Sequence, residues 1–196
     1  MNNNTYIEVT GYSGSTQITL ESRFLKERKV FLQGPITAET ANDLVMKLMY
    51  MEKDDSNEPV RLYVNSPGGE VNGGLLIYDM LQSMTKPVEI YCAGMAASMA
   101  AIILASGGKG RRHILPHSRV MIHEPLLDGG LGGSATSIRH ISESIMETKR
   151  ILNEILSKHT GRAIAEIEKA TSYDNYMNAE ESVAFGICDD ITEKPV

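Results

Sequence analysis

Cysteine, net charge and long apolar runs are all scarce in this sequence of 196 residues, and each shortage argues against a class of protein. The two cysteines, Cys92 and Cys188, lie among apolar residues, which predicts reduced, buried thiols rather than a disulfide scaffold. A net charge of −6 argues against nucleic acid or an anionic membrane as the main partner. No apolar run approaches the length of a membrane span, and the first residues lack the basic and apolar parts of a secretory signal. We therefore expect a cytoplasmic protein.

Metal-ligand patterns are missing as well. The five histidines form no His-x-x-His or His-Glu-x-x-His pair, and Cys-x-x-Cys does not occur. A zinc site needs three or four ligands at usable spacing, so the sequence predicts no metal site.

A repeated alternation of short apolar strands with helices is what the sequence does contain. Strands are predicted near 30–32, 60–64, 88–92, 113–115 and 120–122, with helices beginning near 38, 73 and 98. This rhythm predicts one α/β domain with a mostly parallel sheet and right-handed crossovers. Before it, residues 6–9 are predicted to form a short strand and residues 11–15 a loop.

The pattern changes after residue 123. A loop with four glycines at 126–133 precedes a helix that is predicted to run from about Ser134 to about His159. Its apolar residues are spaced by three, four and seven, and they form a broad apolar face. Such a long helix in a small domain indicates an interface element, and we expect His140 and His159 on it to be solvated or interfacial.

Ser98 has the surroundings that a nucleophile needs. It lies where a predicted strand turns into a helix, among the small residues of the segment GMAASMA (94–100). Small neighbours let a substrate approach, and the unpaired N–H groups of a helix start suit a developing oxyanion. The alternative is an ordinary helix N-cap, a position that serine often occupies.

His123 and an acid would have to complete such a site. His123 ends an apolar strand, and the carboxyl ends of parallel strands are where α/β sites lie. Eight aspartates are present, and spacing does not choose among them. Asp174 is one candidate, because partial burial in its predicted extended segment would suit a carboxylate that orients a histidine.

The segment NSPGG (65–69) follows a predicted strand and allows two interpretations. It is either a tight turn or a loop whose glycines let a substrate backbone approach and whose N–H groups point toward an oxyanion. No Lys-Ser or Lys-Thr follows the glycines, so it is not a phosphate loop.

Taken together, these segments resemble the ClpP family, the proteolytic subunits of the ATP-dependent Clp protease. The resemblance extends from about Tyr6 to Ile191. The stretches that carry it are 21–28 (ESRFLKER), 63–69 (YVNSPGG), 94–99 (GMAASM), 115–123 (LPHSRVMIH), 159–161 (HTG) and 179–186 (AEESVAFG).

The resemblance implies a crotonase-like α/β fold of repeated strand–helix units with a protruding handle helix. The whole chain, 1–196, would form a single peptidase domain, with an axial gate segment at about 2–19 and a handle at about 126–159. The implied activity is that of a serine endopeptidase acting on unfolded polypeptides.

The resemblance also assigns site residues. It implies a catalytic triad of Ser98, His123 and Asp174, which settles the choice of acid. It implies that the amides of Gly69 and Met99 form the oxyanion hole. It further implies an extended substrate that binds along Gly68, Glu70, Val71, Pro125 and Leu126.

Partners follow from the same resemblance. Two seven-membered rings would stack through the handle and enclose a chamber, and an AAA+ unfoldase such as ClpX, ClpA or ClpC would feed it. Tyr63 best matches a residue of the pocket that receives the unfoldase loops. No cofactor is implied, because the ATP is used by the unfoldase.

Several positions depart from the family pattern. Ser172 and Tyr173 stand where an acid and an arginine often precede the aspartate, and Glu124 replaces the common glutamine. The loop 126–133 is about two residues longer than usual. These departures keep open a divergent or scaffolding paralogue that works in mixed rings with a second ClpP subunit. A crotonase-like acyl-CoA enzyme is the other alternative.

Overall fold

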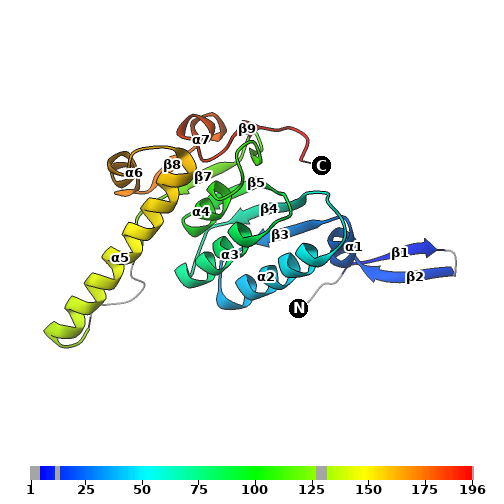
Figure 1. Cartoon of the computed structure of the whole chain (residues 1–196), viewed down its shortest axis with the longest axis horizontal. Helices are drawn as coiled ribbons and strands as arrows, with labels where there is room; N and C mark the ends of the chain where they lie inside the picture. The colour runs from blue at the N-terminus through cyan, green and yellow to red at the C-terminus, as the bar shows by residue number, and fades with distance from the viewer. Residues whose placement is uncertain (1–4, 12–13, 127–131, 196) are drawn as a thin grey trace.

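The computed structural model of the chain describes residues 5–11, 14–126 and 132–195. Parts of the expected gate segment (2–4 and 12–13) and of the glycine-rich loop (127–131) lie outside these residues. Within the described part, helices lie against a twisted and mostly parallel sheet (Figure 1). This confirms the predicted α/β class.

The sheet begins with three long parallel strands and divides at the third. Its main path has the order β3-β4-β5-β6-β9, and β7 pairs with both β5 and β8. All these pairings are parallel except that of β7 with β8. The strands are β3 (Lys29–Gln33), β4 (Val60–Ser66), β5 (Val88–Ala97), β6 (Arg112–Ile114), β7 (Arg119–Ile122), β8 (Asn175–Met177) and β9 (Asp190–Ile191).

The division occurs within β5, which is longer than the sequence predicted. Its residues 90–92 pair with β6, and its residues 95–97 pair with β7. Gly94 lies between the two halves with a φ of 117°, and its N–H donates to Ser118 Oγ at 2.8 Å. A Cβ atom there would lie 2.6 Å from Asn65 Oδ1. Glycine is therefore required where the strand changes partners.

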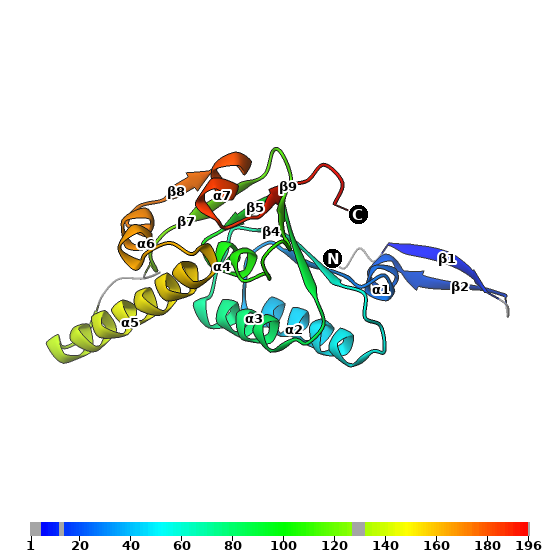
Figure 2. The same ribbon diagram turned by 45° about the horizontal axis from the view of Figure 1, so that its top comes forward.

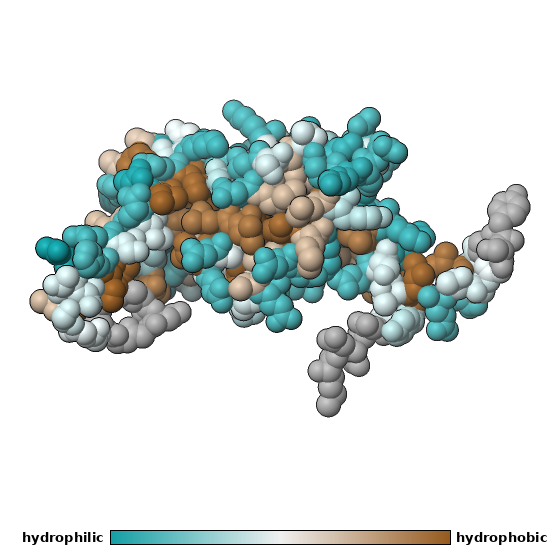
Figure 3. Space-filling model, turned by 60° about the horizontal axis from the view of Figure 1, so that its bottom comes forward, coloured by the Kyte–Doolittle hydropathy of each residue, from teal (hydrophilic) through white to brown (hydrophobic). Residues whose placement is uncertain are grey.

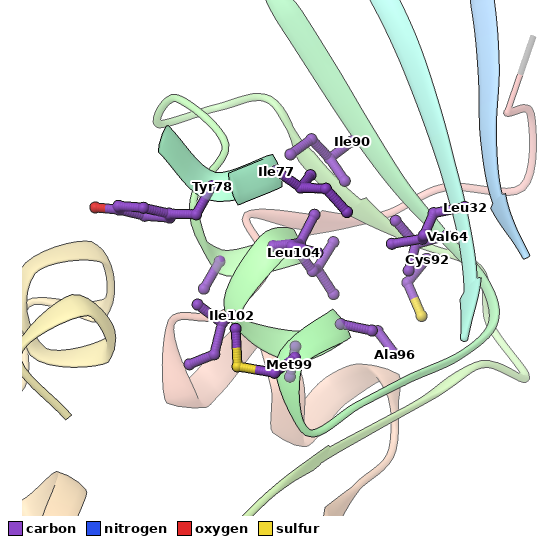
Figure 4. Packing of buried hydrophobic residues seen from close by; sticks show 14 of the residues in the cluster. Leu32, Val64, Ile77, Tyr78, Ile90, Cys92, Ala96, Met99, Ile102 and Leu104 are labelled. Carbon is purple, nitrogen blue, oxygen red and sulfur yellow. The ribbon is translucent and has the colours of Figure 1, made fainter. Parts of the chain in front are cut away.

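Three helices form a layer on one face of the sheet: α2 (Ala38–Lys53), α3 (Val71–Ser83) and α4 (Met99–Ala105). Every residue of α4 is buried, so this short helix is the centre of the core. Figure 4 shows apolar side chains of α3, α4 and the sheet meeting around Leu104. Gly74 of α3 lets α4 approach closely, since a Cβ atom at Gly74 would lie 2.4 Å from Met99 Cε.

The two cysteines are free and buried, as predicted. Burial raises the pKa of the Cys92 thiol to about 12 and raises that of Cys188 as well. Neither thiol is therefore a reactive thiolate near neutral pH.

The long helix α5 (Ala135–Thr160) matches its predicted span closely. Its N-terminal half extends away from the domain, as Figures 1 and 2 show. Its buried residues, Leu152, Asn153, Ile155 and Leu156, all belong to the second half. Gly161 ends the helix with a φ of 75°. The protruding helix of the predicted fold is thus present.

At the opposite end of the molecule, β1 (Tyr6–Gly11) and β2 (Gly14–Thr19) form an antiparallel hairpin (Figure 2). Next comes α1 (Leu20–Lys26), whose N-terminus is capped by Thr19 Oγ1. The sequence analysis missed both β2 and α1. Helix α1 contains no buried residue, so its sequence lacks a clear apolar stripe.

The C-terminal part contains α6 (Ile164–Thr171) and α7 (Ala179–Phe185) around β8. Arg112 ties these elements to the sheet. Its guanidinium is buried, lies 2.5 Å from Asp189 Oδ1, and donates to the carbonyl groups of His159 and Gly186 at 2.9 and 2.8 Å. The end of α5 is fixed to the domain in this way.

His159 is not freely solvated, which was one of the two environments expected for it. Its ring is half-buried, and its Nε2 lies 3.1 Å from the hydroxyl of Tyr78 on α3. Burial, together with the positive charges of Lys158 and Arg112, lowers the pKa of His159 from 6.5 to about 4. The folded protein therefore holds this imidazole neutral where the unfolded chain would protonate it.

This difference predicts a loss of stability in mild acid. Between pH 6.5 and about 4 the unfolded chain binds one more proton at His159, so the free energy of unfolding falls as the pH decreases through this window. We expect His159→Gln to reduce that fall by about 1–2 kcal/mol, after allowing for the partial exposure of the ring. Urea unfolding at pH 7.5 and 4.5 measures it. His140→Gln, on the exposed half of the same helix, is the control, and equal pH dependence in both variants would contradict the prediction.

Candidate active site

Three strand ends meet at one edge of the sheet and carry the predicted triad residues. Strand β7 pairs in parallel with the end of β5, with Ala97 opposite Met121. On its other side it pairs antiparallel with β8, with Ile122 opposite Asn175. Ser98 follows β5, His123 follows β7 and Asp174 precedes β8. The register of β7 therefore brings three residues together that are far apart in the sequence.

Ser98 has a backbone conformation that a side chain rarely adopts. Its φ is 54° and its ψ is −124°, and its N–H donates to Met121 O at 2.8 Å. Although it precedes α4, its hydroxyl makes no capping hydrogen bond. The hydroxyl is instead hydrogen-bonded to His123 Nε2 at 2.8 Å. The simple N-cap interpretation therefore lacks the hydrogen bond that defines it.

His123 and Asp174 are close but not aligned. His123 Nδ1 lies 3.3 Å from Asp174 Oδ1, yet this buried nitrogen has no hydrogen-bond partner among the described residues. Asp174 Oδ1 therefore lies outside the direction in which an N–H group at His123 Nδ1 would point. The side chain of Asp174 is 62% exposed, whereas that of His123 is 13% exposed. The expected partial burial of Asp174 is thus wrong in this chain taken alone.

The loop after β4 lies against the turn at Ser98. A Cβ atom at Gly68 would lie 2.7 Å from Ser98 Cβ and 3.0 Å from Met99 N. Ile36 holds the loop, because its N–H donates to Gly68 O and its carbonyl accepts from Glu70 N, at 2.8 and 2.9 Å.

Two backbone N–H groups remain available there. Within the described part of the chain, the N–H groups of Gly69 and Met99 donate no hydrogen bond. Gly69 has a φ of 148°, and a Cβ atom on it would lie 2.2 Å from Ile36 O. Glycine is thus required at Gly69, and two free donors flank the turn that carries the Ser98 hydroxyl.

A cleft of about 480 Å³ adjoins the Ser98–His123 pair. Met99 and four of the predicted substrate residues line it, namely Glu70, Val71, Pro125 and Leu126, as does Gly69. Gly68 is not part of the lining, and instead it packs closely against the turn at Ser98. The cleft therefore collects most of the residues that the sequence proposed for substrate contact.

The sequence analysis missed the walls of this cleft. They come from Ile36, from Ile102 of α4 and from Leu152, Asn153 and Leu156 of α5. The apolar stripe of α5 suggested an interface, but its C-terminal part faces the cleft. Asn153, a buried polar residue within this stripe, was the one signal that could have indicated it.

Other features of the described residues do not compete with this site. A second cleft, of about 500 Å³, lies between α1, β3 and α2 and has no histidine or Ser98-like turn in its lining. No cluster of three or more potential metal ligands occurs in the part of the chain that the structure describes. No helix there is long and apolar enough to cross a membrane.

An α/β fold with a serine hydroxyl hydrogen-bonded to an imidazole at a strained strand end is characteristic of a serine hydrolase. Comparison with known families is more specific. The model of the Clp protease family matches residues 12–195, so the chain belongs to the Clp protease family. Membership confirms the resemblance and implies a ClpP-type serine peptidase that assembles into oligomers and works with Clp ATPases.

The backbone strain at Ser98 leads to a stability prediction. Glycine accepts a φ of 54° and a ψ of −124°, whereas alanine keeps the strain of serine. We expect the free energy of unfolding of Ser98→Gly to exceed that of Ser98→Ala by about 1 kcal/mol. Thermal unfolding of the two variants measures this difference. Equal stability, or a less stable Ser98→Gly, would show that the turn is unstrained.

Proposed function

We propose that this chain is the serine endopeptidase subunit of a Clp-type protease, and that it hydrolyses unfolded polypeptides in a ring-shaped chamber fed by an AAA+ unfoldase. The observation that carries the proposal is the 2.8 Å hydrogen bond between Ser98 Oγ and His123 Nε2. Beside it lie two backbone N–H groups that donate to no acceptor within the described residues. No cofactor takes part in the peptide hydrolysis itself.

The proposed reaction is acyl transfer. His123 Nε2 takes the proton of the Ser98 hydroxyl as Oγ bonds to the peptide carbonyl carbon. The amides of Gly69 and Met99 stabilise the negative oxygen. His123 then gives the proton to the leaving amine, and water hydrolyses the acyl-enzyme with His123 acting again as the base.

Asp174 is proposed to orient His123. A modest rotation of its exposed side chain would align Oδ1 with the buried Nδ1 atom that now has no partner among the described residues. The neighbouring acid Glu124 is less available, because it lies 2.5 Å from Lys149 Nζ. Asp174 is thus the acid whose position suits the role.

The proposed substrate binds as an extended strand between residues 69–71 and residues 125–126. Peptide backbone added at such an edge gains hydrogen bonds without reading much of the sequence. The apolar walls from Ile102, Leu152 and Leu156 would accept an apolar side chain.

Surfaces of the chain support the proposed assembly of two stacked heptameric rings. On the protruding half of α5, Ile138 and Met146 are 39% and 60% exposed. Figure 3 shows apolar patches on this protruding end and across the middle of the domain. Covering such patches by further copies of the chain would bury apolar surface.

The unfoldase is proposed to dock near Tyr63. This ring stacks between Phe31 and Tyr91, each with its centroid 5.2 Å away, and His113 continues the row beside Tyr91. A row of aromatic rings on one face of the sheet is suited to receive an apolar loop. An AAA+ unfoldase such as ClpX, ClpA or ClpC would supply that loop.

One observation favours a neighbouring subunit at the site, either a second copy of this chain or, in the alternative of mixed rings, a second ClpP paralogue. The His123–Asp174 pair is unaligned in the isolated chain, and Tyr173, directly before Asp174, is 60% exposed. A neighbouring subunit that covers this segment could complete the alignment. A crotonase-like acyl-CoA enzyme has no corresponding need for a Ser–His pair.

Labelling with a fluorophosphonate probe tests the nucleophile. We expect mass spectrometry to place the label on Ser98, and Ser98→Ala to lose labelling and at least about 10⁴-fold of peptidase rate. Both are measured on the purified chain alone and mixed with a second ClpP subunit. Ser83→Ala, at the exposed end of α3, is the control. Cleavage by Ser98→Ala at the wild-type rate, or absence of labelling in every assembly, would refute the proposal.

Replacement of Asp174 tests the orienting acid. We expect Asp174→Asn to lower kcat by about 10²–10⁴-fold and to leave KM nearly unchanged, because the loss concerns the tautomer and orientation of His123. Asp79→Asn, an exposed aspartate on α3, is the matched control. If both variants keep the wild-type kcat in a fluorogenic peptide assay, another group orients His123.

A further inference from the structure

We propose that Glu124 and Lys149 form a positioning pair that holds the segment of His123 against α5 and balances the charge beside its imidazole. This role rests on the proposed function, in which His123 is the general base. Neither residue is proposed to touch the substrate.

The pair is a direct contact between the residue after His123 and the long helix. Glu124 Oε2 lies 2.5 Å from Lys149 Nζ, and their side chains are 41% and 26% exposed. The backbone of Glu124 is held as well, since its N–H donates to Thr171 O at 2.7 Å. His123 is therefore followed immediately by a residue that is fixed at both its backbone and its side chain.

Asp174 is connected to the same helix by a second route. Thr171, at the end of α6, lies three residues before Asp174, and its hydroxyl donates to Asn153 Oδ1 at 3.2 Å. Thr171 and Asn153 are both buried. Asn153 lies four residues after Lys149, so one turn of α5 holds the chain beside His123 and the chain leading to Asp174.

The charge of Glu124 makes this arrangement more than a structural anchor. The charged side chains on the elements next to His123 are Asp174, whose Oδ1 lies 3.3 Å from His123 Nδ1, Glu124 directly after His123, Lys149 paired with Glu124, and Glu70, which lines the same cleft as His123. An unpaired carboxylate at Glu124 would favour the imidazolium, and an unpaired ammonium at Lys149 would disfavour it. While the two are paired, their effects on the imidazole largely cancel.

Three variants separate the effects of charge from those of packing: Lys149→Met, Glu124→Gln, and the double variant. We expect the pKa of His123 to rise by about 0.5 pH unit in Lys149→Met and to fall by about as much in Glu124→Gln. The double variant should return to within about 0.2 pH unit of the wild type. A purely structural contact would not give opposite shifts that cancel.

The pH dependence of diethylpyrocarbonate modification at His123, followed by peptide mass spectrometry on the assembled protein, measures this pKa without requiring peptidase activity. Lys149→Arg keeps the charge and should match the wild type. Arg150→Met removes the next positive charge on α5, which pairs with Glu147 and Glu154, and should cause no shift. Circular dichroism checks that each variant is folded. If Lys149→Met does not fold, the conservative changes Lys149→Arg and Glu124→Gln still test the proposal.

Fluorophosphonate labelling of Ser98 against pH is the second measurement. Its acid limb should move in the same direction as the His123 modification curve in each variant. Shifts that are absent, or that have the same sign in Lys149→Met and Glu124→Gln, overturn the positioning pair. Opposite shifts at His123 without labelling of Ser98 in any variant or in the wild type would uphold the pair and refute the peptidase function.

Discussion

The register of β7 is the constraint on which the site depends. This strand has four residues, and it is held by parallel pairing on one side and antiparallel pairing on the other. Because side chains alternate along a strand, a shift of one residue in either ladder would turn His123 away from its neighbours. The hydrogen bond from Ser98 N to Met121 O fixes one side of this register, and the pairing of Ile122 with Asn175 fixes the other. The position of the imidazole therefore results from the sheet as a whole.

The strain at Ser98 is maintained by the packing around it. The turn lies between a strand that has changed partners at Gly94 and a helix whose seven residues are all buried. Burying these apolar side chains gains far more free energy than the roughly 1–3 kcal/mol that an unusual backbone conformation costs. The core can thus hold the hydroxyl away from its capping position and toward His123. Gly68, Gly69 and Gly74 belong to the same arrangement, because a side chain at any of them would clash with Ile36, Ser98 or Met99.

The long helix has two parts with different environments. Its first half projects from the domain, and its second half is anchored through Arg112, walls the cleft and contacts the segments that carry His123 and Asp174. The projecting half and the half that lines the cleft belong to one continuous helix. One helix thus joins the projecting end of the molecule to a wall of the cleft beside the candidate catalytic residues.

The sequence by itself determined the alternating strands and helices, the span of the long helix and the position of Ser98 at a strand–helix turn, because these depend on local periodicity and on small residues. The resemblance selected Asp174 and the oxyanion donors, which spacing alone could not. Only the tertiary structure decided that β5 divides, that α5 walls the cleft, that His159 is half-buried and that Asp174 is exposed beside an unaligned imidazole. These features depend on which strands pair and which helix faces meet. Such contacts join residues that are distant in the sequence, and local preference carries no record of them.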